Sequence, residues 1–131
     1  MPNDRTPNES FLSHTAVIIP ALNEAPCVAG TVIYWRARGA AVVRVVDNGS
    51  TDETGTRARG AGAEVIHEPR RGYGAAAWTG TRALPAGIEW ILFSSADGSD
   101  RLDDAEQAAF QAAIDRGADL VLGERDRKSV V

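Results

Sequence analysis

The chain has 131 residues with 14 basic and 18 acidic side chains, and its formal net charge of −4 gives no indication of binding to nucleic acid or an anionic membrane surface. The single cysteine, Cys27, excludes an internal disulfide, and we expect it to be buried on a helix. No apolar run reaches the roughly 18 residues of a membrane-spanning helix and no signal peptide is visible, so the sequence predicts a cytoplasmic domain.

Short apolar runs alternate with helical patterns along the chain. A polar tail over residues 1–14, expected to be disordered, comes first. The predicted strands are 16–19, 41–46, 64–67, 89–93 and 119–122. The predicted helices are 26–39, 50–60, 75–83 and 104–117. Strands and helices that alternate through short loops predict an α/β fold: a Rossmann-like three-layer arrangement with helices on both faces of a mostly parallel sheet.

Three polar segments, 20–24, 47–53 and 94–100, follow predicted strands. In an open parallel sheet the carboxyl ends of the strands meet at one edge, and ligands bind there. Asp47 and Asn48 offer an acceptor and an amide that suit a nucleobase or a ribose. The same stretch can equally be an ordinary turn that ends in a helix cap at Ser50, with Glu53 as its capping-box partner.

Oxygen-bearing side chains also cluster after the fourth predicted strand, at Ser94, Ser95, Asp97, Ser99 and Asp100. They suit Mg²⁺ or Mn²⁺ bridging a diphosphate, although a plain turn before a helix explains them as well. The Arg70–Gly74 loop places two guanidinium groups at a helix start, which favours a phosphate but is also common on solvated surfaces. Dinucleotide and P-loop motifs are absent.

In order along the chain, the segments 17–24, 45–52, 72–76 and 96–99 resemble family 2 glycosyltransferases. The closing segment 117–125 is similar to the polyprenyl (dolichol) phosphate sugar transferase branch. The resemblance implies a GT-A fold over residues 15–125, followed by a charged end at 126–131. It also implies a UDP- or GDP-sugar donor, Mg²⁺ or Mn²⁺ as cofactor, and a lipid-phosphate acceptor. Such an enzyme would be cytoplasmic or peripheral to the inner face of the membrane.

The resemblance also implies a donor site, although it assigns no catalytic residue. Asp97 would be the retained aspartate of the Asp-x-Asp motif and the metal ligand, and Arg125 would reach the donor phosphates. The implied donor-binding residues are Pro20, Leu22, Asn23, Glu24, Asp47, Asn48, Gly72, Ala96, Asp97 and Arg125. Glu24 can also be read as a helix-entry residue only.

The chain departs from the family pattern in two ways. Ser95 stands where the family usually has Asp, and Asn48 stands where Asp is frequent. The chain also stops soon after its fifth predicted strand, before the acceptor-binding elements of family members. We therefore expect a donor-binding half with uncovered apolar faces, which self-associates or needs a partner chain. The alternatives are a non-catalytic nucleotide-binding module and a generic flavodoxin-like domain.

Overall fold

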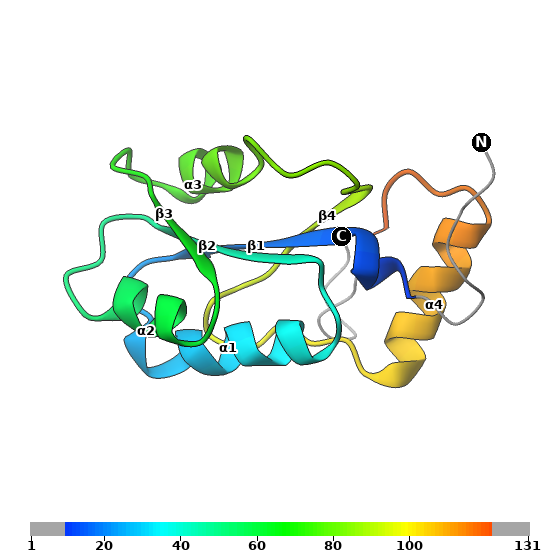
Figure 1. Cartoon of the computed structure of the whole chain (residues 1–131), viewed down its shortest axis with the longest axis horizontal. Coiled ribbons are helices and arrows are strands. Elements are labelled where there is room, and N and C mark those ends of the chain that lie inside the picture. Colours follow the sequence, from blue (N-terminus) through cyan, green and yellow to red (C-terminus); the bar gives the residue numbers. More distant parts are fainter. Residues whose placement is uncertain (1–9, 122–131) are drawn as a thin grey trace, which may run out of the picture. The chain divides into compact units, whose positions relative to one another are not determined.

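The computed structural model describes residues 10–121 and shows a four-stranded parallel sheet with helices on both faces (Figure 1). The elements, in chain order, are η1 (Phe11–His14), β1 (Thr15–Ala21), α1 (Ala25–Ala37), β2 (Val42–Asp47), α2 (Thr54–Gly60), β3 (Glu64–His67), α3 (Tyr73–Gly80), β4 (Trp90–Phe93) and α4 (Asp104–Asp115). The chain divides into two compact units, residues 1–99 and 100–131. The sheet and α1–α3 belong to the first unit, and α4 belongs to the second.

The sheet has the strand order β3-β2-β1-β4, and every neighbouring pair is parallel. β1 therefore lies between β2 and β4, and residues 15–19 of this strand are buried without interruption. A continuous apolar run is what a strand covered on both faces requires. The predicted parallel α/β architecture is confirmed.

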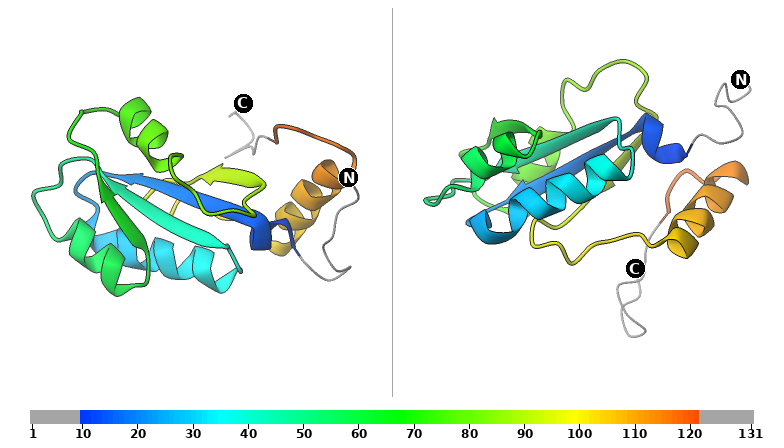
Figure 2. Two further views of the ribbon diagram at one scale, coloured as in Figure 1. Left: turned by 45° about the horizontal axis from the view of Figure 1, so that its top comes forward. Right: turned by 60° about the horizontal axis from the view of Figure 1, so that its bottom comes forward.

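Helices α1, α2 and α3 form two outer layers around this sheet (Figure 1, Figure 2). α1 and α2 cover one face, and α1 turns the buried side chains Val28, Val32 and Trp35 inward. α3 covers the other face, where Gly80 sits directly on β1. A Cβ at Gly80 would lie 2.2 Å from Cγ2 of Ile18, so only glycine permits this close approach.

A buried arginine fastens α3 to the sheet. The side chain of Arg44, in β2, is 3% exposed and forms an ion pair of 2.9 Å with Glu64 of β3. Its guanidinium also donates to the carbonyl oxygens of Gly80, Arg82 and Ala83, at 2.8, 2.6 and 3.3 Å. A cation at the carboxyl end of a helix satisfies carbonyls that have no helical partner and interacts favourably with the helix dipole.

The prediction of a disordered tail over residues 1–14 was wrong for its last part. Phe11–His14 form the 3₁₀ helix η1, in which Phe11 and Leu12 are buried. Ser10 caps it, since its hydroxyl oxygen accepts a hydrogen bond of 2.9 Å from the Leu12 amide. The polar neighbours of these two apolar residues hid their contribution to the core. Residues 1–9 lie outside the described part of the chain.

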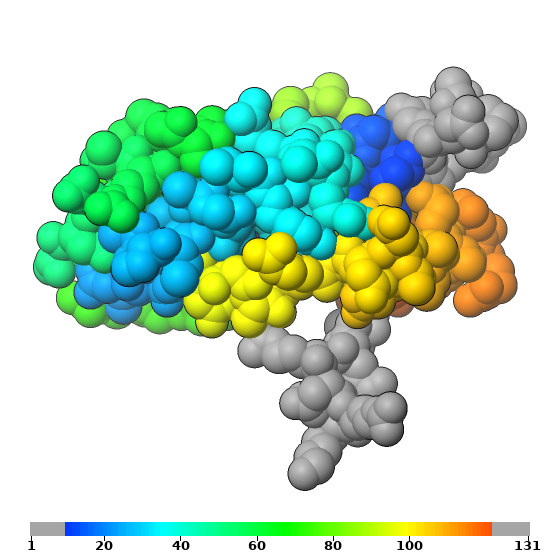
Figure 3. All heavy atoms as spheres, turned by 90° about the horizontal axis from the view of Figure 1, so that it is seen from below, coloured from blue at the N-terminus to red at the C-terminus, as the bar shows by residue number. Residues whose placement is uncertain are grey.

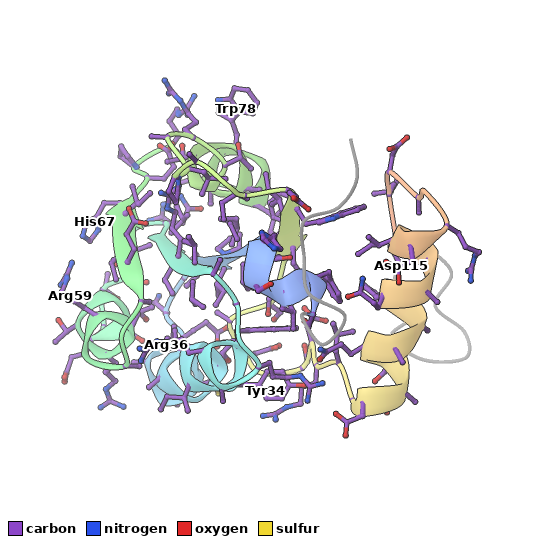
Figure 4. All side chains as sticks on the ribbon, turned by 45° about the vertical axis from the view of Figure 1, so that its right-hand side comes forward. Tyr34, Arg36, Arg59, His67, Trp78 and Asp115 are labelled. Atoms are coloured by element: carbon purple, nitrogen blue, oxygen red, sulfur yellow. The ribbon has the colours of Figure 1, made fainter. Side chains whose placement is uncertain are left out.

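Three further expectations were wrong. Residues 119–121 of the predicted fifth strand are not in a strand, and Leu120 is 73% exposed. An apolar sequence pattern forms a strand only where a neighbouring strand can hydrogen-bond with it. Leu122 lies outside the described residues. Cys27 is exposed, one position from the buried face of α1. The sequence also favours core or core-margin positions for the three tryptophans, Trp35, Trp78 and Trp90, but Trp78 is 63% exposed and points outward from α3 (Figure 4).

The expected uncovered apolar surface is present on β4. This strand is at the edge of the described sheet, and its Ile91 and Phe93 are 40% and 46% exposed. Self-association through it stays a prediction.

Among residues 10–121, no helix combines the length and the apolar character needed to cross a bilayer.

Candidate functional site

Three polar turns meet at the carboxyl edge of the sheet. They follow β1, β2 and β4, and these strands are neighbours that run in the same direction. The backbone amide of Asn48 donates to the Ala21 carbonyl at 2.9 Å, which joins the first two turns directly. The edge is therefore a single surface, at the place where open α/β sheets bind ligands.

Asp47 is the last residue of β2 and is only 6% exposed. Its Oδ1 accepts a hydrogen bond of 2.9 Å from the Ser50 amide, and its Oδ2 lies 3.7 Å from Nδ1 of His67. A Cβ at Gly55 would be 3.2 Å from that Oδ2, so the glycine lets α2 approach the carboxylate closely. The carboxylate is fixed in position at the edge of the sheet.

The side chain of Asn48 holds the loop that follows β3. Its Nδ2 donates to the carbonyl oxygens of Glu68 and Arg70, at 2.8 and 2.7 Å. Its Oδ1 accepts a hydrogen bond of 3.0 Å from the Gly72 amide. Both donors of a primary amide are thereby used within the protein. Contact between Asn48 and a nucleoside stays a prediction, and the structure adds a role in shaping the loop.

The same loop is held from inside by Glu68, whose side chain is 6% exposed. Its carboxylate accepts from the Arg70 guanidinium at 2.9 and 3.2 Å, from the Arg70 amide at 2.8 Å, and from the Thr79 hydroxyl. These hydrogen bonds, led by those from the Arg70 side chain, lower the pKa of Glu68 to about 2. The sequence reasoning did not single out Glu68. Its position between a strand and an Arg-Arg-Gly loop was the only signal.

The turn after β1 is tied to the turn after β2 through Asn23. Asn23 has a backbone φ of 54°, a left-handed conformation that asparagine adopts more readily than most residues. Its amide donates to Oγ of Ser50 at 2.9 Å, and its Oδ1 accepts from the Thr51 amide at 2.8 Å. Ser50 thus fastens the two turns together instead of capping a helix.

Asp52 provides a second connection between these turns. Its Oδ2 accepts from the Ala25 amide at 3.2 Å, at the start of α1, and its Oδ1 accepts from the amide and the hydroxyl of Thr54. The hydrogen bond from the Thr54 hydroxyl lowers the pKa of Asp52. α2 begins at Thr54, and Glu53 makes no side-chain capping bond. The predicted helix start at Ser50 with a Glu53 capping box was therefore wrong.

The remaining predicted donor residues of the first turn differ in exposure. Pro20 is half-buried within β1, Leu22 is 43% exposed, and Glu24 is half-buried. The Glu24 amide donates to Oγ1 of Thr54 at 2.9 Å. This hydrogen bond fixes the backbone of the segment, and the Leu22 side chain is exposed at the edge of the sheet.

The segment after β4 is anchored against α1, where Figure 3 shows it in yellow beside the light-blue helix. Nε1 of Trp35 donates to Oγ of Ser94 at 3.0 Å, and Oγ1 of Thr31 donates to the carbonyl of Ala96 at 3.0 Å. Ser94 and Ala96 are buried as a result, at 2% and 4% exposure. These contacts set the direction in which the next residue, Asp97, leaves the sheet.

Asp97 is exposed at the end of this anchored segment. Its Oδ1 accepts from the hydroxyl of Ser95 at 2.5 Å and from the Ser99 amide at 2.9 Å. Within residues 10–121 no group of three or more His, Cys, Asp or Glu side chains could hold a metal ion. Mg²⁺ is commonly bound by one or two carboxylates, with substrate phosphates and waters completing its shell. Asp97 fits that kind of site and would be its main protein ligand.

The structure thus brings nine of the ten predicted donor residues to one region, namely Pro20, Leu22, Asn23, Glu24, Asp47, Asn48, Gly72, Ala96 and Asp97. The tenth, Arg125, lies outside the described residues. Glu68 and Asp52 were missed because each also bonds a group far away in the sequence, Thr79 at 11 and Ala25 at 27 positions.

The fold and this edge define a Rossmann-like α/β domain with a polar ligand-binding edge. The chain belongs to glycosyl transferase family 2, whose sequence profile matches residues 16–131. It is 40% identical over 109 residues to the uncharacterized glycosyltransferase Rv0539 of Mycobacterium tuberculosis, covering 83% of this chain and 47% of that protein. It is 32% identical over 111 residues to the glycosyltransferase AglJ of Haloferax volcanii, covering 83% of this chain and 35% of that protein.

The solved structures that resemble this chain have a GT-A fold. Glucosyl-3-phosphoglycerate synthase from Mycobacterium tuberculosis, in complex with Mn²⁺, UDP and phosphoglyceric acid, matches with a TM-score of 0.57 and 27% identity, over 63% of this chain and 32% of that one. The same enzyme with Mg²⁺ and UDP gives the same values. The chain spans about half or less of the length of the relatives that it matches.

Proposed function

We propose that this chain forms the donor-binding part of a glycosyltransferase that uses a nucleoside diphosphate sugar with Mg²⁺ or Mn²⁺. The observation that carries the proposal is the meeting of three polar turns at one edge of a parallel sheet, with Asp97 exposed there. Family membership supports it, as do the UDP and metal ions of the similar solved enzyme.

In this proposal each turn has one task. Pro20, Leu22 and Glu24 contact the nucleoside, and Asp47 accepts hydrogen bonds from its base or ribose. Asp97 holds the metal ion, which when bound offsets the negative charge that builds on the departing nucleoside diphosphate. Arg125 contacts the donor phosphates. The fixed carboxylate of Asp47 supports its task, since its position costs no rearrangement when the donor arrives.

For the acceptor we propose a polyprenyl phosphate, as in the branch that the motifs resemble. A lipid phosphate is already ionised at neutral pH, so its oxygen can attack the sugar carbon without a general base. The similar solved enzyme was crystallised with phosphoglyceric acid, another phosphorylated molecule. Transfer to a polyprenyl phosphate would place the whole protein at the inner face of the membrane.

A second candidate is a non-catalytic nucleotide-binding module that needs a partner chain. Ser95 favours it, because a neutral hydroxyl that is bonded to Asp97 replaces the second carboxylate of the usual metal motif. In this case UDP would bind weakly or without a metal requirement. No sugar would be transferred even when the acceptor is present.

Calorimetric titration separates these functions. UDP and GDP are titrated into the chain with and without Mn²⁺, using Asp97→Ala as the test variant and Asp115→Ala, on α4, as the charge-matched control. The proposal expects binding that requires Mn²⁺, is lost in Asp97→Ala and is kept in Asp115→Ala. Binding of UDP that depends on neither Mn²⁺ nor Asp97 would favour the non-catalytic module. No binding by the folded chain would refute both candidate functions.

The acceptor is tested by incubating the chain with radiolabelled UDP- and GDP-sugars and either a polyprenyl phosphate in vesicles or 3-phosphoglycerate. Label in the lipid fraction supports the proposed acceptor, whereas label on phosphoglycerate contradicts it. Transfer by this chain alone would refute the view that it is only the donor-binding part.

A further inference from the structure

Two adjacent arginines in the loop between β3 and α3 have different surroundings. Arg70 is engaged by Glu68 through its side chain and its backbone amide. Arg71, by contrast, has no hydrogen bond or ion pair with any residue in the described range 10–121. Its Nε lies 3.8 Å from the place that a Cβ on Gly49 would occupy, so the guanidinium lies beside the turn after β2. The whole guanidinium of Arg71 is therefore available to a ligand at this edge, whereas that of Arg70 is already bonded to Glu68.

Glu68 also connects the loop to the rest of the edge. Its amide donates to the Asp47 carbonyl at 3.0 Å, and its own carbonyl accepts from Nδ2 of Asn48 at 2.8 Å. Its carboxylate accepts from the Thr79 hydroxyl, which anchors it to α3. The residue therefore contacts β2, the loop and the helix at once, from a nearly inaccessible position.

We propose that Glu68 is a positioning residue of the donor site. By binding Arg70 and fixing the loop, it leaves Arg71 beside the Asp47–Ser50 turn, where the anionic donor binds, and keeps the Gly72 amide bonded to Asn48. This inference rests on the proposed function. It distinguishes the two arginines, since Arg70 serves the loop and Arg71 serves the ligand.

Two views of the site predict opposite changes in UDP affinity when the charge of Glu68 is removed. If only net charge mattered, Glu68→Gln would release the Arg70 cation and bind an anion such as UDP more tightly. If Glu68 positions the loop, the same change weakens UDP binding despite the added positive charge. We expect the dissociation constant of UDP to rise about tenfold, because a neutral amide holds the guanidinium less firmly than a carboxylate.

The test measures UDP affinity by calorimetry in the presence of Mn²⁺, at a temperature where circular dichroism shows each variant to be folded. The control is Glu64→Gln, since Glu64 is also an ion-paired glutamate but is the first residue of β3 and is paired with Arg44, whereas Glu68 follows the last residue of that strand. It should lose stability and keep its UDP affinity. Thr79→Val removes one of the hydrogen bonds that hold the Glu68 carboxylate, so it should weaken UDP binding about threefold.

Amide hydrogen exchange, followed by NMR without any nucleotide, adds an independent measurement. Glu68→Gln should speed exchange at the amides of Arg70 and Gly72, which are bonded to Glu68 and Asn48. Unchanged or tighter UDP binding by Glu68→Gln, with wild-type binding intact, overturns the inference and leaves the proposed function standing. Failure of the wild type to bind either UDP or GDP refutes the proposed function, and unchanged exchange in Glu68→Gln then refutes the loop-holding role separately.

Discussion

Replacing Asn48 by Asp should destabilise the protein more than its small change in shape suggests. Nδ2 of Asn48 donates to two carbonyl oxygens, those of Glu68 and Arg70, and the residue is 6% exposed. In Asn48→Asp a carboxylate oxygen replaces this nitrogen and faces both carbonyls. The accepting bond from the Gly72 amide can remain.

The magnitude follows from these contacts. Two lost hydrogen bonds contribute about 1 kcal/mol each, and leaving the buried oxygens unpaired adds about 1–3 kcal/mol, so the free energy of unfolding should fall by about 3–5 kcal/mol. Urea denaturation at pH 7, followed by circular dichroism and tryptophan fluorescence, measures this change.

Asn23→Asp is the matched control. Oδ1 of Asn23 accepts from the amide and the hydroxyl of Thr51, while its Nδ2 donates to no residue in the range 10–121, so Asp can replace it. This variant adds the same charge and should stay within about 0.5 kcal/mol of the wild type. Equal stability of Asn48→Asp and Asn23→Asp would refute the reasoning that the donated bonds of Asn48 hold the loop.

Three further predictions concern acid stability, packing and metal binding. The pKa of Glu68 is lowered from 4.5 to about 2, mainly by the Arg70 guanidinium. The contribution of Glu68 to the stability of the folded state is therefore complete above pH 4.5 and is lost as the pH falls toward 2. Acid titrations by circular dichroism should show that Glu68→Gln lacks this loss. Gly80→Ala should lower the free energy of unfolding by about 1–3 kcal/mol or more, because its Cβ would overlap Ile18, whereas Gly74→Ala meets no atom within 4 Å and should be neutral or stabilising in urea denaturation. Ser95→Asp should raise Mn²⁺ affinity about tenfold in calorimetry by adding a carboxylate beside Asp97, and an unchanged affinity would place the metal elsewhere.

The common edge of the polar turns was predictable because alternating strands and helices imply parallel strands, whose carboxyl ends coincide. The capping box of α4 was also predictable, since Asp103 and Glu106 are three residues apart and satisfy each other locally. Both inferences depend on neighbours in the sequence or on a general rule of topology.

The bonds that shape the site could not be predicted in the same way. Asn48 is bonded to residues 20 to 24 positions away, and Glu68 is bonded to Thr79 across the loop and the first turns of α3. In the turn after β2, the sequence pattern predicted a helix cap at Ser50. Contacts to the preceding turn, rather than local propensity, decided that Ser50 binds Asn23 and that α2 starts at Thr54.

The most direct test of the proposed donor site locates the metal–nucleotide complex on the protein. Substoichiometric Mn²⁺ is added to the ¹⁵N-labelled chain with UDP, and the paramagnetic loss of each amide signal is recorded against a Mg²⁺ reference. A donor site at this edge predicts selective loss of the signals of 95–99, 47–50 and Gly72, and no such loss in Asp97→Ala. Losses centred away from these three turns, or losses that are unchanged in Asp97→Ala, would contradict it.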